Sequence, residues 1–175
     1  MTTLLAESTG KLTIAMSDRR LDELAFRTAA EIVDSGEPLI VVDAAGCFEP
    51  NRMTHSARIG AIDPAGLMKH LHILRANSAL EMENVILNLE STFERCGTRH
   101  VLIPDLLTCL YDPSISTRDA AHILGRVKAR LEELAETGAR IVVLCRQASN
   151  DLGTRSHFLP SLRASADRVY LRSNT

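Results

Sequence analysis

The sequence predicts a three-layer α/β fold, in which helices cover both faces of a mainly parallel sheet. Strand-like and helix-like segments alternate along the 175 residues, as expected for parallel strands joined by crossover helices. Residues 38–43 are almost continuously apolar, which is typical of a strand buried on both faces. Glycines at positions 36, 97 and 138 each follow a helical pattern, where they can end a helix in a left-handed turn.

Each element is assigned from its periodicity and its end signals. We expect strands at 11–16, 38–43, 71–74, 100–103, 140–145 and 167–172. We expect helices over 21–33, from residue 50 to about 59, after Pro64, over 78–96 and over 117–137. Ser17 or Asp18 is predicted to cap the first helix, since their side-chain oxygens can accept from free amides there. Leu80 is assigned to the inward face of the helix at 78–96, together with Val85, Ile86, Leu89 and Phe93.

Length and composition are those of a soluble globular protein. We interpret 1–175 as a single domain with a core of its own, and 1–10 as a flexible or irregular N-terminal segment. Apolar residues make up 45% of the chain and charged residues 24%. No apolar run approaches membrane-spanning length, and the first residues lack the features of a secretion signal. The expectation is a cytoplasmic protein without a membrane partner.

Cysteine and histidine spacing predicts no metal site. The four cysteines have no short metal-like spacing, and Cys109 and Cys145 lie in or beside apolar runs, which favours buried thiols. His70 and His72 alternate at a predicted strand start but have no cysteine or acidic partner nearby in the sequence.

Positive charge gathers in the C-terminal third of the sequence. Residues 140–175 contain six Arg and two Asp, a balance of +4, so the remainder carries −6 of the total of −2. One interpretation is an anionic partner. The other is a solvated surface of mixed charge.

Ligands of parallel α/β sheets bind beyond the carboxyl ends of the strands. A phosphate-binding loop there needs glycines, so that backbone amides can wrap the phosphates, and a lysine that neutralises them. The segment 17–23 after the first strand has neither, and its Asp18, Asp22 and Glu23 would repel a triphosphate. The upstream Gly10-Lys11-Leu12-Thr13 lacks a preceding strand. ATP and magnesium are therefore not expected cofactors.

The segment 43–52 is the most informative part of the sequence. Its Asp-x-x-Gly-x-Phe-x-Pro-x-Arg pattern resembles a segment of RecA/RadA-type recombinase cores. In those proteins a Glu in this segment activates the water that attacks ATP. Here that position is Ala45, which has no titratable group to act as a base.

Further ordered matches extend this resemblance from about residue 11 to 172. They are the segments 60–64 and 164–172, the strand that ends at Asp105, and Gln147. The resemblance implies a RecA-like P-loop NTPase fold that lacks a functional P-loop. It also implies that Asp105 is the counterpart of the Walker B Asp, which helps to hold magnesium in the family's ATPases.

The resemblance also indicates DNA-contacting or interface residues. The segment 114–119 resembles one DNA-contacting loop of the family and contains Arg118. The segment 148–157 corresponds to another and contains Arg155. Gln147 matches the Gln that couples nucleotide state to that loop, whereas Arg146 departs from the family pattern.

These observations predict a non-catalytic RecA/RadA-like accessory protein of DNA recombination or repair. It would bind a RecA-like recombinase or itself, and single-stranded DNA is a further candidate partner. Three alternatives stay open. One is a SulA-like or ImuA-like regulator of cell division or mutagenic repair. Another is a composite ATPase that a partner completes, with Arg19, Arg20 or Arg146 acting in trans. The third is an unrelated enzyme that uses Asp43, Asp105 and His157.

Overall fold

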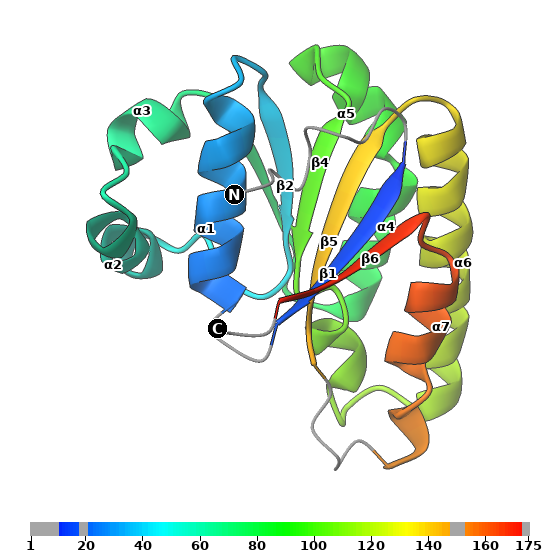
Figure 1. Ribbon diagram of the computed structural model, residues 1–175. Coiled ribbons are helices and arrows are strands. Elements are labelled where there is room, and N and C mark those ends of the chain that lie inside the picture. Colours follow the sequence, from blue (N-terminus) through cyan, green and yellow to red (C-terminus); the bar gives the residue numbers. More distant parts are fainter. Residues whose placement is uncertain (1–10, 18–20, 148–152, 173–175) are drawn as a thin grey trace.

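The fold is built on one six-stranded, all-parallel sheet (Figure 1). The computed structural model describes residues 11–17, 21–147 and 153–172. The strands are β1 (Leu12–Ser17), β2 (Leu39–Asp43), β3 (Leu71–Arg75), β4 (His100–Pro104), β5 (Arg140–Arg146) and β6 (Arg168–Arg172). Their order across the sheet is β3-β2-β4-β5-β1-β6. This order differs from the dinucleotide-binding order 3-2-1-4-5-6 and from the flavodoxin order 2-1-3-4-5.

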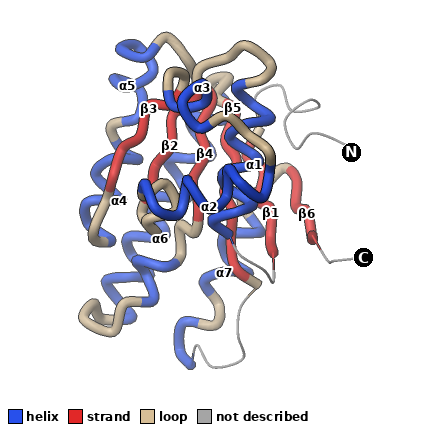
Figure 2. The backbone as a smooth tube through the Cα atoms, turned by 90° about the vertical axis from the view of Figure 1, so that its left-hand side faces the viewer, coloured by secondary structure: helices blue, strands red, loops and turns tan. Residues whose placement is uncertain are grey.

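Helices cover both faces of the sheet, which confirms the three-layer α/β prediction. One layer holds α1 (Leu21–Val33), α2 (Pro50–Gly60) and α3 (Pro64–Met68), and Figure 2 looks onto this layer. The other layer holds α4 (Ala79–Leu87), α5 (Leu89–Cys96), α6 (Thr117–Glu136) and α7 (Phe158–Ala164). Buried apolar side chains accordingly form two clusters, one on each face. Neighbouring residues of β1 alternate between them: Ile14 belongs to the α4–α7 side and Ala15 to the α1–α3 side.

Local sequence signals explain where several helices begin and end. The Ser116 hydroxyl accepts from the amide of Asp119 at 3.0 Å and so caps α6. The Asp63 carboxylate accepts from the amides of Ala65 and Gly66, both at 3.0 Å, and caps α3. Gly97 ends α5 with a φ of 66°, a left-handed conformation in which a side chain would be strained.

Three sequence predictions about the elements were wrong or incomplete. The helix predicted over 78–96 is two helices that meet at Asn88. Leu80 was expected to face inward but is 64% exposed, because α4 turns its buried residues Met82 and Ile86 toward the core instead. The helix α7 and the short 3₁₀ helix η1 (Thr108–Tyr111) had no predicted counterpart.

The described part of α1 begins at Leu21, so its capping by Ser17 or Asp18 stays a prediction. Ser17 is the last residue of β1, and Asp18 lies outside the described residues, as does the predicted N-terminal segment 1–10. Within the described ranges, no helix has both the length and the apolar character that crossing a membrane requires.

Candidate functional site

The carboxyl ends of β4 and β5 bring together an aspartate, Asp105, and an arginine, Arg146. Asp105 follows β4, is 3% exposed, and has a φ of 50°, a left-handed conformation that Asp tolerates better than most residues. Its amide donates to the carbonyl of Leu144 at 2.8 Å, which ties this turn to the neighbouring strand. Non-glycine residues in this conformation are concentrated at functional sites and switch regions.

One oxygen of the Asp105 carboxylate is occupied by groups of the chain itself. Its Oδ2 accepts from the Thr108 hydroxyl at 2.7 Å and from Nε of Arg146 at 2.8 Å. Arg146 is the last residue of β5, so the parallel pairing of β4 with β5 places the two side chains at one edge of the sheet. The Arg146 side chain is 68% exposed while that of Asp105 is 4% exposed. A buried carboxylate therefore holds the Nε side of an arginine whose side chain is largely open to solvent.

Asp43 has a structural role at the end of β2. Its two carboxylate oxygens accept from the backbone amides of Cys47 and Phe48, each at 2.9 Å. Arg75 supports the same turn, since its Nη1 lies 3.8 Å from Asp43 and its Nη2 donates to the Phe48 carbonyl at 3.0 Å. Both carboxylate oxygens of Asp43 are thus used to fold the turn. Ala45 lies in this turn, half-buried against the apolar cluster of the α1–α3 face.

The thiols near the strand ends are held protonated. Burial, followed by the charge of Asp43, raises the pKa of the Cys47 thiol to about 12. Burial, with a smaller effect of Asp105, raises the pKa of the Cys145 thiol. Thiolates are the nucleophilic form of cysteine, so both side chains are inert at neutral pH. Among the described residues, no group of three or more His, Cys, Asp or Glu side chains is arranged to hold a metal ion.

Arg155 is used inside the protein. It lies in the short 3₁₀ helix η2 (Gly153–Arg155) and donates from Nη1 to the carbonyls of Leu110 and Asp112, both at 2.7 Å. Its Nη2 donates to the carbonyl of Ile115. We call the segment 108–117, to which Arg155 donates these hydrogen bonds, the clamped loop. Its geometry therefore gives Arg155 a structural role and leaves little of its guanidinium for a phosphate.

The other site residues predicted from the sequence are dispersed. Arg118 is exposed on the first turn of α6. The Gln147 side chain is exposed, and its amide donates to the carbonyl of Ser17 at 2.9 Å. His157 packs its ring edge-on against Phe158 at 4.8 Å, and no hydrogen bond or ion pair of the described residues joins it to Asp43 or Asp105. Arg19, Arg20 and the segment 148–152 lie outside the described residues.

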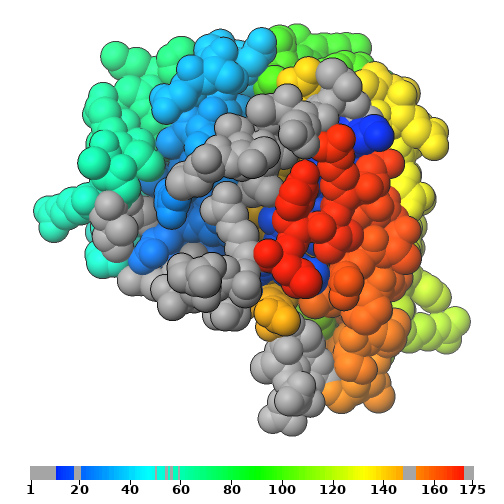
Figure 3. All heavy atoms as spheres, viewed as in Figure 1, coloured from blue at the N-terminus to red at the C-terminus, as the bar shows by residue number. Residues whose placement is uncertain are grey.

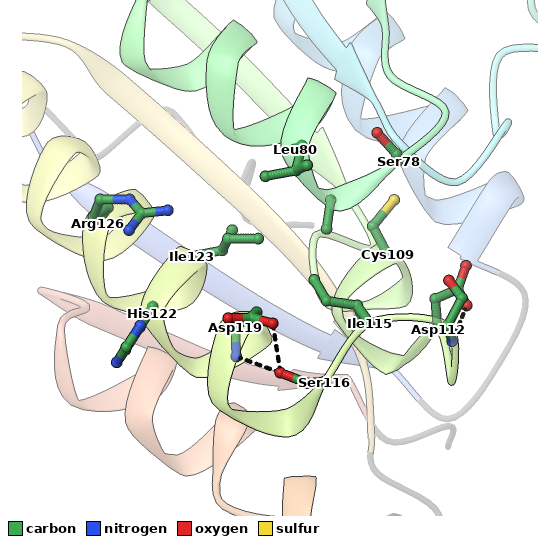
Figure 4. Close-up of a pocket in the computed structure, with 12 residues that line it drawn as sticks. Ser78, Leu80, Cys109, Asp112, Ile115, Ser116, Asp119, His122, Ile123 and Arg126 are labelled. Carbon is green, nitrogen blue, oxygen red and sulfur yellow. Dashed lines mark hydrogen bonds between the residues drawn. The ribbon is translucent and has the colours of Figure 1, made fainter.

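A pocket that the sequence reasoning missed lies between α4 and α6 (Figure 4). Its volume is about 470 Å³, and the clamped loop forms part of its wall. The lining residues come from three separate segments, namely Ser78–Leu80, Cys109–Ser116 and Asp119–Arg126. The exposure of Leu80 creates one wall, and the error in its predicted orientation is the reason why the pocket was not anticipated.

No protein-family model matches the sequence, and a search of curated proteins finds no significant match.

Proposed function

We propose that this protein is a non-catalytic, RecA/RadA-like accessory protein that acts by binding other proteins. The observation that carries the proposal is the contact between Arg146 and Asp105, at 2.8 Å. The resemblance of the β4 strand end to a Walker B segment implies that an active family member would use this carboxylate near a magnesium ion. In this protein a guanidinium already occupies Oδ2 of this carboxylate.

This pairing argues against magnesium and ATP at the site for a physical reason. Magnesium requires close, nearly octahedral oxygen coordination. A cation that approached Oδ2 of Asp105 would have to displace Arg146 or be repelled by it. Two further features point the same way. The position of the family's catalytic Glu carries the methyl group of Ala45, and Asp43 is held by two backbone amides, so neither can act as the base.

The experiment is a nucleotide-binding and turnover assay on the purified full chain. We expect no saturable binding of a fluorescent ATP analogue with magnesium, and no phosphate release, in contrast to an active RecA-type recombinase measured in parallel. Micromolar binding with turnover by this chain alone would refute the proposal. Turnover that appears only with an added partner would instead favour a composite ATPase. In that case Arg146→Ala should abolish the activity if Arg146 acts in trans.

The proposed partners are a RecA-like recombinase or a second copy of this chain in the cytoplasm. Co-sedimentation with filaments of a RecA-type recombinase tests the first, and analytical ultracentrifugation of the chain alone tests the second. If neither association is observed, this part of the proposal is refuted.

Single-stranded DNA is a separate candidate partner, which the exposed Arg118 and the C-terminal charge of +4 favour. In Figure 3 the residues of α7 and β6, in orange and red, form a continuous stretch of surface in this charged third. Phosphate contacts would make binding salt-dependent. We expect Arg118→Ala to weaken binding of a labelled oligonucleotide at low salt, whereas Arg95→Ala, at an exposed position on α5, is the matched control and should leave binding unchanged. No binding, or binding that Arg118→Ala leaves unchanged, would limit the proposal to protein partners.

A further inference from the structure

The pocket between α4 and α6 has the size and construction of a binding site. Its volume of about 470 Å³ lies within the range of roughly 300–1,000 Å³ that is usual for ligand sites. Ser78 at the start of α4 and Ser116 at the start of α6 lie on its wall, and each uses its hydroxyl to cap its own helix. The entrance is therefore set by two rigid helices and by a loop that Arg155 fastens.

Apolar side chains line one wall of the pocket. Leu80 of α4 and Ile123 of α6 lie on facing sides of the pocket, with Ile115 beside them (Figure 4). Leu87 lies seven residues after Leu80 in the same helix, and the two side chains are 40% and 64% exposed respectively. Residues seven apart share a helix face and are separated by about 10 Å along the axis. The exposed, polar Asn84 lies between them on that face. The face from Leu80 to Leu87, which we call the Leu80–Leu87 strip, is longer than a small ligand and suits an extended or helical peptide.

The rim of the pocket is negative. Asp112 and Asp119 are exposed, and the hydrogen-bond donors on their carboxylates are the neutral amide of Ser114 and hydroxyl of Ser116. Arg126 is the lining residue with a permanent positive charge, and it is already paired with Glu83 through two hydrogen bonds.

The Cys109 thiol in the pocket wall lies near several carboxylates. Burial raises the pKa of the Cys109 thiol, and the carboxylates of Asp105, Asp112 and Glu81 raise it further. Arg155, which donates to the Asp112 carbonyl, offsets part of the charge of Asp112. The field in the pocket therefore favours a cation.

We propose that this pocket and the Leu80–Leu87 strip bind a short segment of a partner protein that carries an aliphatic side chain next to Lys or Arg. The aliphatic side chain would enter between Leu80 and Ile123, and the basic residue would face Asp112 and Asp119. This inference rests on the proposed function, since it gives a protein-binding accessory the place where its partner docks. An apolar anchor surrounded by complementary charge is a common design of peptide-binding grooves.

The test uses a phage-displayed library of random 12-residue peptides, selected on the immobilised full chain. We expect enrichment of sequences that combine Leu, Ile or Met with neighbouring Lys or Arg. A fluorescent copy of the most enriched peptide should bind the wild type with an affinity that falls as salt is added. Leu80→Ser should weaken this binding at least about tenfold, as loss of an interface anchor does. Met68→Ser, at a 41% exposed position on α3, is the matched control and should leave the affinity unchanged.

The double variant Asp112→Asn/Asp119→Asn tests the charge argument, because Asn retains a hydrogen-bond acceptor for Ser114 and Ser116. We expect weaker binding and a smaller salt dependence. The proposal is overturned if no sequence is enriched, if the enriched sequences lack basic residues, or if the peptide binds the Leu80→Ser variant as tightly as the wild type. If a variant fails to fold, the charge argument is decided by the wild type alone, whose affinity for the peptide must fall as salt is added. None of these outcomes depends on nucleotide, so a failed peptide test leaves the ATP result standing.

Discussion

Replacement of Arg155 by Ala provides a quantitative test of how the clamped loop is held. Arg155 donates to the carbonyls of Leu110 and Asp112 at 2.7 Å each, and also to that of Ile115. These acceptors lie after β4, while Arg155 lies after β5, so one side chain joins two loops that are about 40 residues apart. The variant removes all of these contacts at once.

The expected loss follows from how exposed each carbonyl is. The bonds to Leu110 and Ile115 are partly buried, and each is worth about 1 kcal/mol, while the exposed carbonyl of Asp112 can bind water instead and contributes about half of that. Arg155→Ala should therefore lower the free energy of unfolding by about 2–3 kcal/mol. Arg155→Lys keeps the charge but cannot reach three divergent acceptors, so it should lose about 1–2 kcal/mol.

Urea denaturation followed by circular dichroism measures both values, with an unchanged slope of free energy against urea as the sign that only stability has changed. Arg163→Ala on the exposed side of α7 is the matched control and should stay within about 0.5 kcal/mol of the wild type. The reasoning fails if Arg155→Ala is as stable as Arg163→Ala. It also fails if Arg155→Lys is as stable as the wild type, since charge alone would then account for the effect.

Three further predictions follow from single features of the fold. A methyl group added at Gly125 or at Gly97 would meet no atom within 4 Å, but of these two glycines only Gly97 has a positive φ. Gly125→Ala should therefore stabilise the protein by about 0.5–1 kcal/mol, whereas Gly97→Ala should destabilise it by about 1 kcal/mol. Thermal melts of the two variants would contradict this if both shifted in the same direction. Asp43→Ala leaves the amides of Cys47 and Phe48 without their acceptor and should cost about 2–4 kcal/mol by urea titration; a loss below about 1 kcal/mol would show that another group replaces the carboxylate. The pKa of Cys47 is raised from its ordinary value of 9.0 to about 12, so its contribution to stability is complete below pH 9 and is lost as the pH rises through 12. Thiol-reactive dye at pH 8 should accordingly label the half-buried Cys96 and spare Cys47 until urea unfolds the chain, and early labelling of Cys47 in the folded protein would refute the assignment.

The strands and the layers were predictable because their signals are local and strong. Every residue of β2 is buried, as its unbroken apolar run indicates. The boundaries of α6 follow from a Ser116 cap and from regular apolar spacing. Such patterns depend on the residues of the element itself.

The predictions that failed concern segments whose local signals compete with one another. Asn88 interrupts the expected long helix, and its side-chain amide donates to the carbonyl of Asn84 at 2.7 Å, a local competition that periodicity does not reveal. The helix α7 had no predicted counterpart, although its Pro160 is compatible with a helix, because proline is tolerated in the first turn, where no amide donor is needed.

The candidate site was predicted only in part. The sequence identified Asp105 and Arg146 as separate residues of interest, yet it gave no sign that they pair with each other, since β4 and β5 are brought together only by the sheet. Arg155 was expected to contact DNA because the segment 148–157 corresponds to a DNA-contacting loop of the recombinase family. Its actual role depends on three backbone carbonyls whose positions no sequence pattern encodes.

The position of β1 in the sheet has a consequence for how the chain is made. The first strand lies between the last two, with Ile14 opposite both Val143 and Val169. During synthesis at about 5–20 residues per second, residues 12–17 leave the ribosome long before either neighbour exists, so they must wait several seconds for their partners. The apolar β1 is then a target for chaperones or for wrong pairing, and we expect the β2–β3–β4 part of the sheet to form first and β1 to join only with β5.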